Sequence, residues 1–222
     1  RPYVDLGSIK VAPREGLQMR LDVEESTQRI VAVSLDYADS TLQVQAFSAP
    51  KSTGLWHEIR AQLSTQLVAQ GATVEEREGA LGLEMLAALP VTEERGGGTT
   101  AVRFIGVDGP RWVLRGVITG AGAADPEAAA KIESLYRELV VVRGDSPMPP
   151  RELLALRVPA GAQVGDHGIN AVLVDGTQAI GRDAQFDPAV FAGHPEAARV
   201  DIGDERAAGA VVGMTDVVTR HH

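Results

Sequence analysis

The chain of 222 residues contains no cysteine. Disulfides, thiolate nucleophiles and cysteine-ligated metal sites are therefore excluded, and the composition is compatible with a reducing cytosol. Aromatic residues make up only 4% of the chain, so aliphatic side chains must fill the core. No stretch has the length and apolar character of a transmembrane helix. No signal peptide is visible in the given sequence, and we expect a cytoplasmic protein.

Positive charge is also scarce. The formal net charge is −9, and Lys10, Lys51 and Lys131 are the only lysines, so arginine supplies most of the cations. An acidic chain is repelled by polyanions, which argues against non-specific binding to nucleic acid and to anionic membranes. We therefore expect neither nucleic acid nor a membrane among its partners.

Common catalytic and cofactor motifs are missing as well. No GxGxxG run follows a predicted strand, and neither a GxxxxGK[ST] phosphate loop nor a GxSxG nucleophile elbow occurs. Histidines do not occur at the spacing of metal ligands. The sequence therefore predicts no cofactor and no metal, and it identifies no reaction.

The most informative stretch runs from Val102 to Gly116 and reads VRFIGVDGPRWVLRG. Its two arms alternate between residues of opposite faces, which is typical of strands. Between them Asp108-Gly109 is a strong hairpin-turn signal, because glycine accepts a positive φ without strain. Pro110 cannot donate to a strand ladder, so it is placed at the exit of the turn.

Three arginines of this hairpin allow two interpretations. Arg103, Arg111 and Arg115 can converge to clamp an anion, since guanidinium groups bind carboxylate and phosphate bidentately. Alternatively they lie on a solvated sheet face, where their stems cover apolar surface. Asp108 is likewise either a turn residue or a catalytic acid or metal ligand. Asp108 and Glu84 are the two candidate bases.

Two helices interrupt the strands. Apolar residues recur every four positions from Leu55 to Leu67 and Gly71 follows, which indicates an amphipathic helix. Trp56, in its first turn, is either packed on the sheet or part of a binding surface. The second helix begins at Asp125-Pro126, an N-cap followed by proline at the first helical position. It is expected to run on to Val142 and to break before the proline-rich Arg143–Arg151 segment.

The element order is several strands, a helix, several strands and a helix. This order predicts an α+β fold, with an antiparallel sheet flanked by two main helices. Residues 1–159 are interpreted as the core domain. Residues 160–222 contain nine glycines and nine acidic residues against four arginines, and form a Gly-rich acidic C-terminal extension with short strands. This extension is a candidate for self-association into a homo-oligomer.

The C-terminal extension also contains acidic residues and histidines that can be imagined around calcium. Their spacing matches no ion-binding loop, and in particular no D-x-[DN]-x-[DN]-G run occurs. These residues are Asp166, His167, Asp183, Asp187, His194, Asp201 and Asp204.

Four separated motifs resemble an actinobacterial family of proteins of unknown function. They are YVDLGSIKVAPREGLQMRL, LQVQAFSAPKSTGLW, VRFIGVDGPRWVLRG and VVVRGDSPMPPRELLALRVP. The resemblance covers about Tyr3 to Pro159 and implies a cytosolic bacterial protein whose charged N-terminal extension would precede Arg1. Because the family has no assigned activity, the resemblance implies no catalytic residue in this chain. The element order also resembles the Mog1/PsbP-like α/β/α sandwich, whose members mostly act as binding or accessory proteins.

Three functions stay open at this point. The first is a non-enzymatic binding or accessory protein with a protein partner. The second is an enzyme or small-molecule binder that holds an anionic ligand with the three hairpin arginines. The third is a structural protein that self-associates through residues 160–222. The candidate binding surface of the first comprises Trp56, Asp108, Gly109, Pro110, Arg111, Trp112, Arg143 and Asp145.

Overall fold

The computed structural model describes residues 2–24, 27–160, 164–165, 168–169 and 197–199. Its main feature is an antiparallel eight-stranded sheet with the order β13-β3-β4-β5-β9-β8-β7-β6. Consecutive strands joined by short turns lie next to each other, as expected for antiparallel pairing. The strands are β3 (Gln18–Glu24), β4 (Arg29–Tyr37), β5 (Ser40–Ser48), β6 (Thr73–Gly79), β7 (Gly82–Pro90), β8 (Thr99–Gly109), β9 (Trp112–Gly120) and β13 (Ala197–Arg199).

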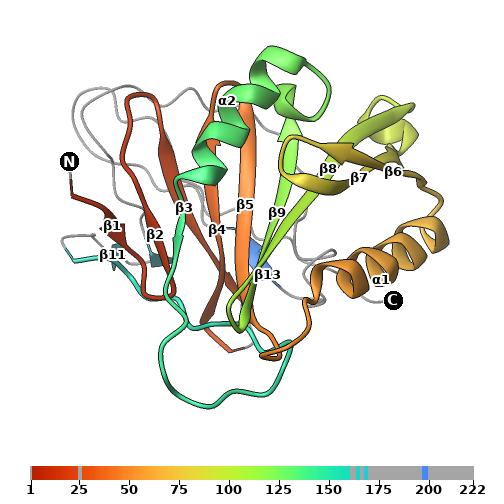
Figure 1. Cartoon of the computed structure of the whole chain (residues 1–222). Helices are drawn as coiled ribbons and strands as arrows, with labels where there is room; N and C mark the ends of the chain where they lie inside the picture. Colours follow the sequence, from red (N-terminus) through yellow and green to blue (C-terminus); the bar gives the residue numbers. More distant parts are fainter. Residues whose placement is uncertain (1, 25–26, 161–163, 166–167, 170–196, 200–222) are drawn as a thin grey trace, which may run out of the picture.

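The two main helices lie on opposite faces of this sheet (Figure 1). Helix α1 (Trp56–Ala69) packs on the face to which Val117 points, and helix α2 (Pro126–Arg137) packs on the face of Ile118. Each face therefore has its own apolar core, because successive residues of a strand point to opposite sides. The predicted α+β class, with an antiparallel sheet and two flanking helices, is confirmed.

Local signals set the helix ends that the sequence predicts. The carboxylate of Asp125 accepts a hydrogen bond of 2.8 Å from Ala128 N at the start of α2, with Pro126 as the first helical residue. After α1, Gly71 has φ of 85°, and Ala72 N donates to Leu67 O at 3.0 Å. This is the glycine-terminated arrangement that satisfies the last helical carbonyls.

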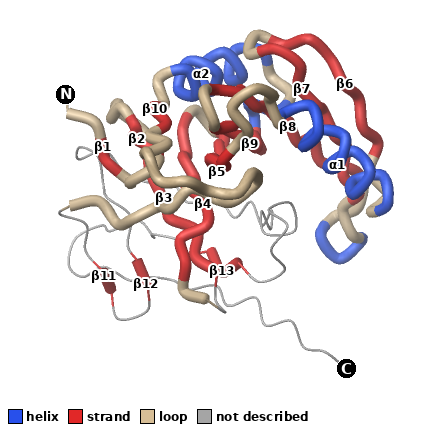
Figure 2. The backbone as a smooth tube through the Cα atoms, turned by 60° about the horizontal axis from the view of Figure 1, so that its bottom comes forward, coloured by secondary structure: helices blue, strands red, loops and turns tan. Residues whose placement is uncertain are grey.

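The C-terminal end of α2 differs from the prediction. The helix ends at Arg137 and does not run on to Val142. Val140–Val141 form strand β10 instead, which pairs with β2 (Ile9–Val11), itself paired with β1 (Val4–Asp5). Consecutive β-branched residues pack well in a strand, and β2 supplies the partner that sequence patterning did not reveal. Figure 2 shows β1, β2 and β10 side by side near the N-terminus.

The chain after the proline-rich segment returns along the end of β5. Ser48 N donates to Glu152 O, Arg151 N donates to Ser48 O, and Leu154 N donates to Ala46 O, each at 2.8 Å. Residues 151–157 then reach the N-terminus, where Arg157 N donates to Leu6 O at 2.9 Å. This segment pairs with its neighbours only at isolated bridges, and it thereby connects the main sheet with the β1–β2 region.

The remaining described elements are short. They are η1 (Glu93–Arg95), η2 (Ala121–Ala123), β11 (Val164–Gly165) and β12 (Gly168–Ile169). Of the extension, which is predicted to contain short strands, the structure describes β11, β12 and β13. The acidic and histidine residues considered as calcium ligands lie outside the described residues.

Candidate functional site

The turn of the β8–β9 hairpin lies two residues later than predicted. Gly109 pairs with Trp112, so Pro110 and Arg111 are the two central residues. Proline suits the first central position of a turn, and Arg111 has φ of 62°, a region that favours glycine. A turn centred on Asp108-Gly109 would have put proline into the β9 ladder, where it has no N–H to donate.

Asp108 has a structural task in this arrangement. Its Oδ1 accepts hydrogen bonds from Leu55 N at 2.7 Å and Trp56 N at 3.1 Å, at the beginning of α1. A Cβ atom on Gly54 would lie 2.4 Å from Asp108 Oδ2, so glycine makes this approach feasible. The Asp108 carboxylate, which belongs to strand β8, therefore caps the N-terminus of helix α1. The interpretation of Asp108 as a turn residue was wrong, because Asp108 pairs with Val113 within the strand ladder.

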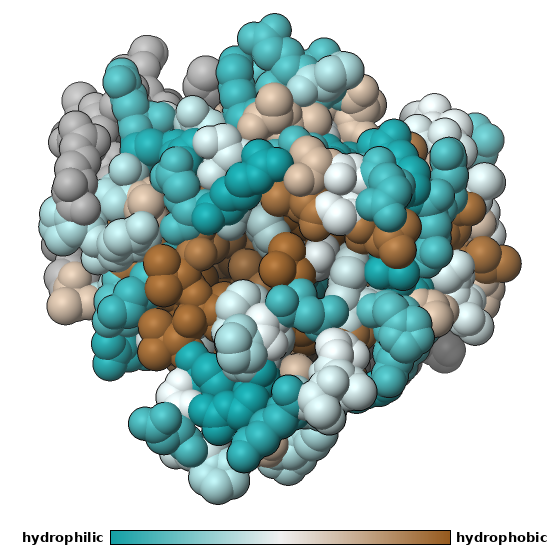
Figure 3. Space-filling view, in the orientation of Figure 1, coloured by the Kyte–Doolittle hydropathy of each residue, from teal (hydrophilic) through white to brown (hydrophobic). Residues whose placement is uncertain are grey.

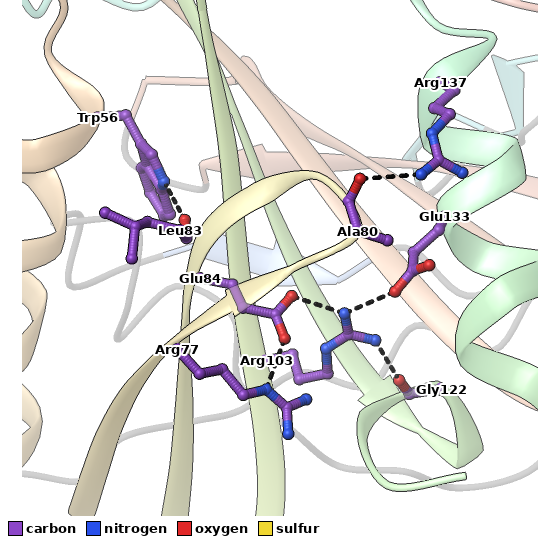
Figure 4. Close-up of polar contacts among 9 residues, drawn as sticks. All are labelled: Trp56, Arg77, Ala80, Leu83, Glu84, Arg103, Gly122, Glu133 and Arg137. Atoms are coloured by element: carbon purple, nitrogen blue, oxygen red, sulfur yellow. Dashed lines mark hydrogen bonds and ion pairs between the residues drawn. The ribbon is translucent and has the colours of Figure 1, made fainter. Parts of the chain in front are cut away.

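Trp56 belongs to the core and not to a binding surface. It is 5% exposed, and its Nε1 donates to Leu83 O at 2.7 Å (Figure 4). Its ring lies over Gly106, where a Cβ atom would come within 2.3 Å of it. The guanidinium of Arg60 stacks 5.6 Å from the ring centre. Packing on the sheet, one of the two interpretations of Trp56, is therefore correct.

Trp112 is only half-buried and stays near the surface. Its ring lies over Gly109, and it packs against the core on the α2 side of the sheet. A Cβ atom on Gly109 would be 2.1 Å from the ring, so the glycine is required for this close approach. One of the two tryptophans thus remains at the hairpin tip.

The proline-rich segment meets this tip through reciprocal hydrogen bonds. Arg143 Nε donates to Arg111 O at 3.1 Å, and Arg111 Nη2 donates to Gly144 O at 3.2 Å. Arg143 Nη1 also donates to Ser146 O at 3.0 Å. Deeper in the structure, the buried Ser48 hydroxyl donates to Pro149 O at 2.8 Å. Residues 109–112 and 143–148, which we call the tip surface, are therefore held together although distant in sequence.

The three hairpin arginines do not converge. Arg115 pairs with Gly106, three residues from Arg103, so Arg103 and Arg115 point to opposite faces of the sheet. Arg111 lies in the turn at the far end of the hairpin. The proposed three-arginine clamp was wrong, as was the alternative of a solvated face, because Arg103 and Arg115 are both buried.

Arg103 is neutralised within the protein, as Figure 4 shows. Its Nη2 donates to Glu84 at 2.7 Å and to Glu133 of α2 at 2.8 Å, and its Nη1 donates to Gly122 O at 3.0 Å. Burial lowers the pKa of a guanidinium, but the bonds to the two carboxylates outweigh that effect, and the pKa of Arg103 is raised. Glu84 also accepts from Arg77 at 2.7 Å, so it is an ion-pair partner and not a free base.

Arg115 is enclosed on the α1 side of the sheet. Its guanidinium donates to Gln45 and stacks 5.5 Å from the centre of the Phe47 ring. Burial disfavours its charged form and lowers its pKa to about 10. This side chain is a buried packing group, not part of a site shared with the other two arginines.

A polar sheet face was missed by sequence reasoning. Opposite the α2-side core, β3, β4 and β5 carry alternate polar side chains that are buried. Ser34 Oγ and Gln43 Nε2 both donate to Asp22 Oδ2, at 2.7 and 2.9 Å, and Arg20 pairs with Asp36 at 2.8 Å. The alternation in QMRLDVE and TLQVQAF indicated a polar side, but not that its groups would bond to each other across strands.

The described part of the chain offers neither a metal centre nor a membrane span. Within it, no group of three or more histidine or acidic side chains is arranged to hold a metal ion. None of its helices is long and apolar enough to cross a membrane.

Comparisons with known proteins provide a family but no activity. A search of curated proteins finds no match. Among solved structures, cyanobacterial PsbP (CyanoP) from Synechocystis sp. PCC 6803 is similar at 12% identity, over 61% of this chain and 87% of that chain, with a TM-score of 0.35. That similarity is weak, and the fold class rests on the strands and helices of this chain. Residues 1–164 match the model of a protein family of unknown function, DUF3710, and the chain therefore belongs to that family.

Proposed function

We propose that this protein is a non-enzymatic binding or accessory module that contacts a protein partner in a bacterial cytosol through its tip surface. One observation carries the proposal: the hairpin turn and the proline-rich segment are locked together by hydrogen bonds between Arg111 and the residues Arg143 and Gly144. A loop surface that is held in place before binding loses less conformational entropy when a partner docks.

The side chains at the tip suit a protein contact. Half-buried Trp112 and Met148 lie beside the two arginines, and Asp145, Ser146 and Pro147 are exposed. Tryptophan, methionine and arginine are enriched in protein interfaces. Asp145 and its neighbours form the outer rim, where a partner would meet polar groups.

The fold does not bring together the residues on which the enzyme alternative depends. Its arginines point in different directions, Asp108 caps α1, and Glu84 is buried between Arg77 and Arg103. Among the described residues, these groups do not form one site that can hold and transform an anionic ligand. Binding at the tip therefore explains more of the observed geometry.

Cross-linking tests the proposal, because the chain has no native cysteine that would compete for a label. A photo-reactive maleimide is attached to the Ser146→Cys variant and, as a control, to the Gln62→Cys variant on the exposed side of α1. We expect a defined protein from an extract of the source cells to cross-link at Ser146 only, and unlabelled chain to compete with it. Identical products from both positions, or none at the tip, would show that the tip is not the contact surface.

A further inference from the structure

Within the part of the chain that the structure describes, no carboxylate pairs with the two arginines of the tip surface. Among the described contacts, Arg111 and Arg143 donate to backbone carbonyls only. Acidic side chains outnumber basic ones in this chain of net charge −9. Seven other arginines do pair with a carboxylate, namely Arg14, Arg20, Arg60, Arg77, Arg103, Arg151 and Arg157.

The two cations are also held in fixed positions. Each guanidinium bonds to the backbone at or next to the other arginine, so the pair forms one unit with several N–H groups still available. Arg111 occupies a left-handed backbone conformation, which disfavours any residue other than glycine by about 1 kcal/mol. This strained backbone makes the Arg111 side chain a candidate for a functional role.

Apolar surface adjoins this arginine pair. Val140 and Val142 are 38% and 41% exposed, and Val142 immediately precedes Arg143. Figure 3 shows a hydrophobic patch on this face, over the chain that descends from α2 towards the loop at residues 143–150. Exposed apolar groups next to unneutralised cations suit a ligand that carries both kinds of group.

The backbone of the edge strand β10 suits an extended ligand. Strand β10 is the last strand of its three-stranded sheet, in the order β1-β2-β10. Val140 pairs with Lys10, and Val142 N donates to Ser8 O at 2.8 Å, so the intervening Val141 N–H and C=O point away from β2. A peptide strand can add to such an edge through main-chain hydrogen bonds, while its side chains meet the valines.

We propose that the β10 edge and the Arg111–Arg143 pair bind an extended segment of a partner protein, with alternating apolar residues next to one or two acidic residues. This inference rests on the proposed protein-binding function and specifies the partner's chemistry. The apolar residues contact Val140 and Val142, and a carboxylate bridges the two guanidinium groups. A polyanion such as RNA fits less well, because the protein's net negative charge repels it and the valines find no partner.

The test measures binding of a fluorescein-labelled peptide in which two glutamates adjoin alternating valine and threonine residues. The matched peptide replaces both glutamates by glutamine. With the full chain, we expect the glutamate peptide to bind about tenfold more tightly, because it makes charge-assisted hydrogen bonds to the arginines. Equal affinity for the two peptides, or no binding of either, overturns the proposal.

Variants locate the site on the protein. Arg143→Gln and Arg111→Gly should each weaken the glutamate peptide about tenfold and leave the glutamine peptide nearly unchanged. Arg137→Gln is the control, since Arg137 is an exposed arginine that likewise donates to a carbonyl, that of Ala80. If Arg137→Gln weakens binding as much as Arg143→Gln does, net charge and not the site is responsible, and the proposal fails.

The apolar contact has its own pair of variants. Val142→Thr keeps the branched shape but adds a hydroxyl, and it should weaken both peptides about threefold. Val68→Thr, at a 58% exposed position on α1, should change neither affinity. Equal effects of the two substitutions contradict docking at β10. If these experiments fail while tip cross-linking succeeds, protein binding stands and only the acidic, extended ligand is wrong.

Discussion

Arg77 and Arg103 share one carboxylate, Glu84, but differ in burial: their side chains are 43% and 3% exposed. We expect Arg103→Met to lower the free energy of unfolding by ~3–5 kcal/mol, because it leaves Glu84 and Glu133 without their buried partner. Arg77→Met should cost less than ~1 kcal/mol, as exposed ion pairs contribute little. Urea denaturation followed by tryptophan fluorescence measures both. Equal losses would mean that burial does not set the strength of this network.

Tyr136 provides a pH test at the same scale. Its hydroxyl donates to Leu114 O at 2.6 Å. Burial and the charge of Asp108 raise its pKa well above the usual 10 and outweigh the opposing hydrogen bond of the Val107 backbone. With the folded pKa raised, the neutral phenol's contribution to stability is complete below pH 10 and is lost as pH rises above it. We therefore expect alkaline unfolding to coincide with ionisation of Tyr136.

Absorbance at 295 nm checks this expectation, because it reports tyrosinate directly. The part of the absorbance change that is missing from the Tyr136→Phe variant should coincide with the unfolding transition of the unsubstituted protein. Its appearance before unfolding would contradict the burial of Tyr136. The pH dependence that Arg115 contributes to stability has the opposite sign. Its pKa is lowered to about 10, so the cost of burying its charge is lost as the pH rises above that value.

At the scale of elements, α1 depends on a residue from another strand. Leu55 precedes the helix and offers no side-chain cap, so Asp108 of β8 accepts the free N–H groups instead. Asp108→Ala should lower the free energy of unfolding by ~1–2 kcal/mol, the usual effect of losing an N-cap. Asp145→Ala, at the exposed tip, should change it by less than ~0.5 kcal/mol. Thermal unfolding followed by circular dichroism compares the two, and similar losses would refute the capping assignment.

The two helices also show which element boundaries are predictable. The signals of α2 lie within it: Asp125 caps Ala128, three residues away. Its end was misplaced because β10 forms through pairing with β2, more than 120 residues earlier in the chain. Local hydrogen bonds are legible in a sequence, whereas strand pairing between distant segments depends on the whole chain.

On the scale of the whole molecule, the described residues of both apolar cores lie between Val4 and Val158. We therefore expect a chain that ends at Pro159 to unfold in a single cooperative transition, as its cores are retained. Calorimetry compares it with the full chain. A broad, non-cooperative transition would show that residues 160–222 are required for folding, and that the predicted boundary at 159 is wrong.

The same pair of proteins tests self-association. Light scattering should give more subunits per particle for the full chain than for the shortened chain only if the extension mediates assembly. Equal subunit numbers for both chains would remove the self-association hypothesis, whatever the outcome for folding. Since the extension's composition alone motivated that hypothesis, this measurement decides it independently of the tip surface.

The sequence by itself determined the α+β class, the antiparallel strand order through short turns, the cap at Asp125 and the glycine after α1, because periodicity and capping act over a few residues. Only the tertiary structure decided what the functional candidates do. In the tertiary structure Arg103 and Arg115 lie on opposite faces of the sheet, Trp56 is buried, and Asp108 caps the N-terminus of α1. The tertiary structure also brings Arg143 to Arg111, since contacts between distant segments follow from packing and leave no local pattern.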